Sequence, residues 1–256
     1  RLYIYEDLEL LASIKSTKLI SNIPSHLRSS KNTWFGLSKR ARVIIVDKNR
    51  VKNGEIKRIE DLANQKWEGR ICSRPGSHVY NRALMASIIA AHGNIEAEKW
   101  ANKFVNNLAR KPQGNDRAQV KAIYEGECDI AIINNYYFGK LKFSEDPEQK
   151  KWIKNLRLIF PNQEDGDRGS HINISGGGIA KFSKNKNEAI ALLEFLTSEK
   201  AQKLYGEINF EYPVNPNIAT TSELKSWGVF KEDQLPIIKI AELAPVAQKI
   251  IDRVGW

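Results

Sequence analysis

The stretch C-D-I-A-I-I-N-N-Y-Y-F-G-K-L, Cys128 to Leu141, decides how the rest of the sequence is interpreted. Its apolar run, Ile130 to Ile133, is bounded by turn-forming residues on one side and by two asparagines on the other. Such a run is typical of a strand buried on both faces of a parallel sheet, although periodicity alone leaves a buried helix open. Tyr136 and Tyr137 follow where the strand should end. Because ligands of open α/β sheets bind beyond the carboxyl ends of the strands, these phenols are candidates for ligand binding as well as for packing.

Strand and helix patterns alternate on the amino-terminal side of this stretch. Val43 to Val46 is a second short apolar run, and a third strand is expected around Arg70 to Ser73. The alternation between residues 41 and 141 indicates βαβ units and a mainly parallel sheet. Asn81 is expected to cap a helix that runs from residue 82 to 91, and Asp116 is expected to cap one that ends at Tyr124.

Length and composition indicate an ordinary globular chain. With 256 residues it can form one large domain or two smaller lobes, and its 41% hydrophobic and 27% charged residues are not those of a disordered protein. No apolar stretch approaches the length of a membrane span. The net charge of +10 suggests acidic partners, such as nucleic acid, anionic lipid or small anions.

The motifs that mark common enzymes and nucleic-acid-binding proteins are missing. The four histidines show no H-x-x-x-H spacing, no G-x-S-x-G is present, and the glycines at 176–178 lack the spacing of a phosphate loop, so close backbone approach or a hinge is the better explanation for them. The basic residues are dispersed along the chain. Cys72 and Cys128 are too few for a zinc site or a disulfide scaffold, which leaves two buried thiols or one disulfide. These motifs therefore give enzyme functions only weak support, and we expect a protein that is not an enzyme.

Three tyrosines share one kind of position. Tyr80, like Tyr136 and Tyr137, falls where a strand should give way to a helix, and the bases Arg74 and Lys140 lie nearby in sequence. A phenol has a pKa near ~10 and ionises at neutral pH only beside strong positive charge. A trivalent metal ion supplies such a charge and prefers hard oxygen donors. From the residues alone, simple packing remains the plainer interpretation.

Segments along nearly the whole chain resemble the ferric-iron-binding proteins of cyanobacterial iron ABC transporters. They are W-F-G-L-S-K-R-A-R-V-I, A-H-G-N, P-Q-G-N-D, I-N-N-Y-Y-F-G-K-L, F-P-N-Q, H-I-N-I-S-G-G-G, N-F-E-Y-P-V and D-R-V-G-W. The resemblance implies an α/β, two-lobed periplasmic substrate-binding protein of type II. Its mixed, mainly parallel sheets would be flanked by helices, and iron would sit in the cleft between the lobes.

The resemblance also implies a division of the chain. Residues 1–40 would be the remainder of lobe 1 leading to the hinge, and residues 41–168 would form lobe 2. Residues 169–212 would return to lobe 1 through the hinge, and the helices in 213–256 would pack back on lobe 2. Relatives carry an additional amino-terminal region with the opening strand of lobe 1 and further candidate ligands. We therefore expect an amino-terminally shortened form, without a signal peptide and with lobe 1 incomplete.

The family's site residues can be carried over by position. Its tyrosine ligands for Fe³⁺ fall on Tyr80, Tyr136 and Tyr137. Arg40 and Arg74 fall where relatives keep bases near the cleft. Lys140 stands where relatives commonly have arginine, so it keeps the charge and loses the planar fork of a guanidinium.

The expected function is capture of ferric iron in the periplasm and delivery to the membrane permease of an ABC importer, by a monomer that does not bind nucleic acid. One alternative keeps the fold and changes the cargo to a small anion such as phosphonate or sulfate, with the tyrosines as hydrogen-bond donors. A second alternative is a basic nucleic-acid-binding protein, whose affinity would fall steeply with salt.

Overall fold

The computed structural model describes residues 1–256, and its contacts divide the chain into two compact units. Unit 1 comprises Arg1–Arg40, Ile172–Val229 and Gln234–Ala241. Unit 2 comprises Ala41–His171, Phe230–Asp233 and Glu242–Trp256. None of the helices is both long enough and apolar enough to cross a bilayer. The assignment of lobes and a hinge to particular residue ranges stays a prediction.

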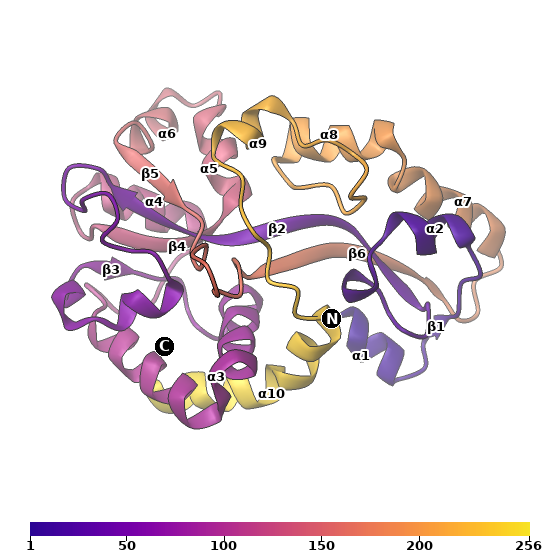
Figure 1. Cartoon of the computed structure of the whole chain (residues 1–256), viewed down its shortest axis with the longest axis horizontal. Helices are drawn as coiled ribbons and strands as arrows, with labels where there is room; N and C mark the ends of the chain where they lie inside the picture. The colour runs from indigo at the N-terminus through magenta and orange to yellow at the C-terminus, as the bar shows by residue number, and fades with distance from the viewer. The chain divides into compact units, whose positions relative to one another are not determined.

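Unit 1 is built on a small sheet with helices from both ends of its sequence (Figure 1). The strand β1 pairs antiparallel with β6, which neighbours the first part of β2. A Cβ added at Gly178 would lie 2.5 Å from the carbonyl oxygen of Thr33, so the glycine run serves close backbone approach. The elements of this unit are α1 (Leu2–Asp7), β1 (Leu11–Ala12), α2 (Thr17–Asn22), η1 (Ser25–Leu27), the first half of β2 (Trp34–Asp47), β6 (Ile172–Ala180), α7 (Lys186–Leu196), α8 (Glu199–Asn209), α9 (Ser222–Ser226) and the start of α10 (Ile237–Val254).

Unit 2 has a central sheet in which the predicted strand is fully buried. All five residues of β4 (Ile130–Asn134) are buried, as expected for a strand covered on both faces. The other elements of the unit are η2 (Ile59–Ala63), η3 (Gln65–Trp67), β3 (Ile71–Cys72), α3 (Val79–Asn106), α4 (Asp116–Tyr124), α5 (Asn135–Lys142), α6 (Pro147–Trp152), β5 (Leu156–Ile159), the second half of β2 and most of α10.

The sheet of unit 2 is mixed, as expected, but parallel pairing is less general than the sequence suggests. The strands β3 and β4 are parallel neighbours, whereas β2 pairs antiparallel with both β4 and β5. The reason lies in the connections. Two helices, α3 and α4, link β3 to β4, which is the crossover that a parallel pair needs. Only the short η2 and η3 lie between β2 and β3, so no βαβ unit forms there.

The helix α3 corrects one expectation about its start. It begins at Val79, with the His78 ring accepting a hydrogen bond from the Tyr80 backbone N–H at 3.3 Å, so Asn81 lies inside the helix and is not its cap. The helix expected over residues 82–91 is present. The chain bends after it, because Gly93 adopts φ 76°, and continues as a second helical segment. In Figure 1, α3 lies on the side of β2 and β4 opposite to α5 and α6.

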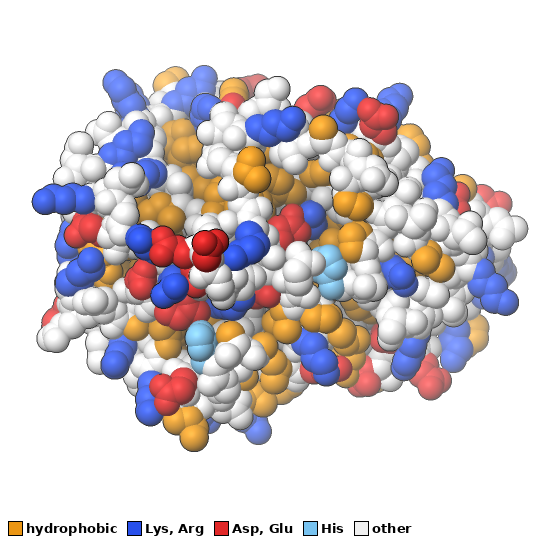
Figure 2. All heavy atoms as spheres, in the orientation of Figure 1, with side chains coloured by type: hydrophobic (Ala, Val, Ile, Leu, Met, Phe, Trp, Pro, Cys, Tyr) orange, Lys and Arg blue, Asp and Glu red, His pale blue; other side chains and the backbone are white.

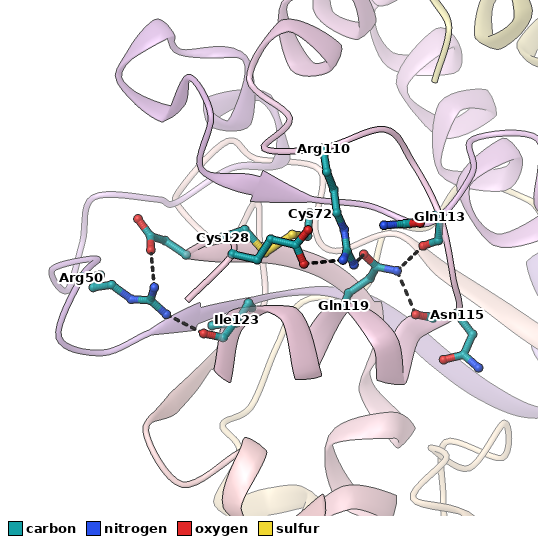
Figure 3. Close-up of a disulfide and its surroundings, with 10 residues drawn as sticks. Arg50, Cys72, Arg110, Gln113, Asn115, Gln119, Ile123 and Cys128 are labelled. Atoms are coloured by element: carbon teal, nitrogen blue, oxygen red, sulfur yellow. Dashed lines mark hydrogen bonds and ion pairs between the residues drawn. A yellow bond between two sulfur atoms is a disulfide. The ribbon is translucent and has the colours of Figure 1, made fainter. Parts of the chain in front are cut away.

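A disulfide joins Cys72 to Cys128, the alternative that the sequence left open. Cys72 is in β3 and Cys128 precedes β4, and the pairing of these strands brings the two Cα atoms to 5.8 Å. Figure 3 shows the bridge beside the Arg110 side chain, which pairs with Glu127 and donates to Gln119 at 3.3 Å. The bridge therefore ties the strand that leads toward Tyr80 to the one that leads toward Tyr136.

We expect removal of this disulfide to destabilise unit 2. The bridge links residues 56 positions apart, and the chain-entropy model gives about 4 kcal/mol of free energy of unfolding for a loop of this length. The variant Cys72→Ala/Cys128→Ala should lose hydrogen-exchange protection at the β3 and β4 amides, and the wild type under reducing conditions should match it. Unchanged protection in both samples would contradict the prediction.

Candidate metal centre

The three tyrosines lie at one edge of the sheet because β3 and β4 end there together. The strands are parallel neighbours, so their carboxyl ends lie side by side. The chain enters α5 directly after β4, which places Tyr136 and Tyr137 in the first turn of that helix. After β3 a short loop leads to α3, and Tyr80 is the second residue of that helix. Two helix starts thus carry all three phenols.

The structure brings the predicted tyrosines into contact. The Tyr80 and Tyr136 hydroxyl oxygens are 3.0 Å apart and hydrogen-bonded, and the Asn134 amide donates to the Tyr136 hydroxyl at 3.4 Å. The rings of Tyr136 and Tyr137 are in contact, with centroids 4.5 Å apart. All three side chains are partly buried. Packing alone does not require that phenol oxygens point at one another.

The surroundings keep two of these phenols neutral. Burial raises the pKa of Tyr136 far above its ordinary value, and its hydrogen bond with Tyr80 adds to the effect. Burial likewise raises the pKa of Tyr137, to which the Asp116 carboxylate contributes and which the Arg74 guanidinium opposes. Without a bound cation, the pair is therefore protonated at neutral pH.

Cationic side chains surround the phenol cluster. The Arg74 guanidinium carbon lies 4.9 Å from the Tyr80 ring centroid, and the Lys140 Nζ lies 5.5 Å from that of Tyr136. Arg117, which the sequence analysis did not select, lies 5.3 Å from the Tyr137 ring.

Arg40 belongs to unit 1, where it donates to the Ser175 hydroxyl at 3.0 Å. Its expected role in charge balance stays a prediction.

A buried ion cluster lies next to the tyrosines. The Asp116 carboxylate is fully buried and pairs with Arg42 at 2.6 Å and with Arg74 at 2.9 Å. The Arg42 guanidinium carbon also lies 5.7 Å from the Tyr80 ring. Asn115 is the residue that caps α4, with its side chain accepting from the Ala118 N–H, so the expected capping role of Asp116 is wrong. The carboxylate is one residue too far into the helix to cap it and turns to the two arginines instead.

Two asparagines complete this cluster. Asn81 accepts from Arg42 at 2.6 Å, and Asn134 accepts from the same guanidinium at 3.2 Å. The backbone N–H of Asn134 donates to Asp116 at 2.8 Å. The sequence analysis missed these residues. One signal was available for Arg42: a charge directly before the apolar run of a buried strand needs a buried partner.

The phenols are the hard donors that the fold gathers at this place. The structure contains no group of three or more His, Cys, Asp or Glu side chains that could hold a metal ion. The one carboxylate nearby, Asp116, is already bound to two arginines. The cluster can therefore donate hydrogen bonds as neutral phenols, or bind a hard cation if the phenols lose their protons.

We expect the Tyr136 phenol to stay neutral up to pH 10 and beyond. Because its pKa is raised, ionisation of this group begins only above its ordinary value as pH increases. In a spectrophotometric titration at 295 nm, the absorbance lost on Tyr136→Phe should be confined to pH values above about 10. A component that disappears with Tyr136→Phe and titrates below pH 9 would contradict this.

Comparisons with known proteins find bacterial solute-binding proteins, several of them named for iron uptake or iron binding. The family model for bacterial extracellular solute-binding proteins matches residues 5–231. Iron uptake protein A1 of Synechocystis sp. PCC 6803 is 42% identical over the whole chain, which corresponds to 71% of that relative. The structure of apo FutA2 from Synechocystis matches with a TM-score of 0.95 at 40% identity and covers all of this chain and 81% of the other.

The structure of a Trichodesmium protein, IdiA or FutA, in complex with iron and citrate matches equally well, with a TM-score of 0.95 at 45% identity. It covers 100% of this chain and 80% of the other. These findings confirm the resemblance and the α/β fold class predicted from the sequence.

Proposed function

Because this chain belongs to the family of bacterial extracellular solute-binding proteins, we propose that it captures ferric iron through the phenolates of Tyr80, Tyr136 and Tyr137. It then delivers the ion to the permease of an ABC importer. The observation that carries the proposal is the direct contact of the Tyr80 and Tyr136 hydroxyls at 3.0 Å, with the Tyr137 ring packed against that of Tyr136.

The relatives support iron as the cargo. One is named for iron uptake, and the Trichodesmium structure contains iron and citrate. The family is one of binding proteins and not of enzymes, and the phenol cluster needs no covalent chemistry to act as a carrier. The Lys and Arg side chains on the face shown in Figure 2 are scattered and interspersed with acidic ones, which gives no support to binding of nucleic acid along a basic stripe.

The site suits a trivalent cation for reasons of charge. Tyr136 and Tyr137 are neutral before binding, so they do not attract other cations strongly. Fe³⁺ would displace their protons, and three phenolates would balance its three charges. Arg74 faces Tyr80 and Lys140 faces Tyr136. Both cations would stabilise the phenolates, and their repulsion of Fe³⁺ would lower the affinity for the ion. We include Arg40 in this charge balance on the resemblance alone.

The periplasm is the proposed location, with the protein acting as a monomer. Family membership indicates an extracellular protein. The Cys72–Cys128 disulfide is consistent with this, because disulfides persist in oxidising compartments such as the bacterial periplasm.

Titration with ferric iron should produce a visible phenolate-to-iron charge-transfer band. The variant Tyr136→Phe/Tyr137→Phe should lose most of the band, because only the Tyr80 phenolate remains. It should also bind iron more weakly, by a factor above the ~10- to 100-fold typical of changes outside the coordination sphere. Tyr124→Phe is the matched control, because Tyr124 is 49% exposed at the end of α4 and should leave the band unchanged.

Absence of a visible band in the wild type would defeat the ligand assignment. Calorimetry with sulfate and with a phosphonate tests whether the cargo is a small anion. Tight anion binding without a response to iron would identify an anion carrier.

Iron binding should release protons and weaken as pH falls. If three neutral phenols become phenolates, about three protons are released per ion, and affinity should fall about tenfold per proton for each unit of decreasing pH. A pH-stat titration in weak buffer measures the number after correction for the iron donor complex. Tyr137→Phe should release about one proton fewer. Release of fewer than one proton by the wild type would be incompatible with phenolate ligation.

A further inference from the structure

We propose that Asp116 is the positioning residue of the tyrosine site. It holds Tyr80 and Tyr136 in register through two arginines and one asparagine. This inference rests on the proposed function, because it assigns a role in iron binding to a carboxylate outside the coordination sphere.

The contacts of Asp116 converge on both tyrosine-bearing segments. One carboxylate oxygen accepts from Arg74, in the loop that leads to Tyr80, at 2.9 Å. The other accepts from Arg42 of β2 at 2.6 Å and from the Asn134 backbone N–H, at the end of β4, at 2.8 Å. A single side chain therefore links three neighbouring segments at the edge of the sheet where the phenols lie.

From each partner, a further contact reaches a phenol. The Arg42 and Arg74 guanidinium carbons lie 5.7 and 4.9 Å from the Tyr80 ring centroid, so both restrict that ring. The Asn134 side chain, which accepts from Arg42, donates to the Tyr136 hydroxyl at 3.4 Å. The 3.0 Å contact between the Tyr80 and Tyr136 hydroxyls joins the two paths.

Stability alone is a poor explanation for this cluster. Asp116 is fully buried and Arg42 is 2% exposed, and burying such charges costs about as much free energy as their pairing returns. The Nε atoms of Arg42 and Arg74 are also buried without a hydrogen-bond partner, which adds to the cost. A cluster with this free-energy cost is better explained by the positions that it imposes on Tyr80 and Tyr136.

Asp129 offers a matched control in the same unit. It also pairs with two arginines, Arg50 at 2.9 Å and Arg70 at 2.6 Å. It directly precedes β4, at the end of that strand opposite to Tyr136. Replacing Asp129 by Asn therefore removes a comparable ionic cluster from the same strand while leaving the tyrosine site untouched.

The test compares Asp116→Asn with Asp129→Asn in two measurements. In iron titrations, Asp116→Asn should weaken affinity about 10- to 100-fold and shift the visible band, whereas Asp129→Asn should change neither. In crystal structures without iron, the Tyr80 and Tyr136 hydroxyls should separate beyond hydrogen-bond distance in Asp116→Asn only. The second measurement does not depend on iron, so the positioning role can be judged even if the wild type gives no band and the proposed function fails.

Two results would overturn the proposal. One is a folded Asp116→Asn protein that keeps the wild-type hydroxyl contact and affinity. The other is an equal loss in Asp116→Asn and Asp129→Asn, which would indicate general destabilisation. If Asp116→Asn does not fold, Asp116→Glu is tested in its place, because it keeps the charge but displaces the carboxylate oxygens. An unchanged hydroxyl contact and iron affinity in that variant would again overturn the proposal.

Discussion

The pairing of one buried carboxylate with two arginines is the constraint on which the candidate site depends. Asp116 has no solvent to stabilise its charge, so the fold must bring Arg42 and Arg74 to it. Those arginines come from β2 and from the loop after β3, and satisfying one carboxylate therefore fixes where these segments meet the end of β4. The three phenols lie directly beyond this junction. Their mutual contacts are a consequence of how the charges beneath them are paired.

The disulfide and the ion cluster both act on the strands β3 and β4. Cys72 and Cys128 join β3 to the segment before β4, while Asp116 ties the carboxyl ends of the strands together. Between them, β3 and β4 have little freedom to slide, and register decides where the helices that follow begin. A helix start displaced by one residue would rotate its side chain by about 100° and separate the phenols.

The charge pattern around the tyrosines fits a reversible carrier. Burial keeps Tyr136 and Tyr137 protonated, so these two phenols carry no negative charge that would bind other cations strongly. Nearby bases favour ionisation once a trivalent ion arrives and at the same time repel that ion. A site with these opposing contributions can bind iron selectively and still release it, because proton concentration and charge repulsion both act against the bound state.

The sequence by itself determined the strand at Ile130 to Ile133, the helix over residues 82–91 and the placement of Tyr80, Tyr136 and Tyr137 at strand-to-helix junctions. It could do so because short apolar runs, glycine and helix starts are encoded locally. Tertiary structure alone decided the antiparallel pairing of β2, the disulfide and the buried cluster around Asp116. These depend on contacts between residues far apart in the chain, and a carboxylate at a helix start has the same local pattern whether it caps the helix or binds two distant arginines.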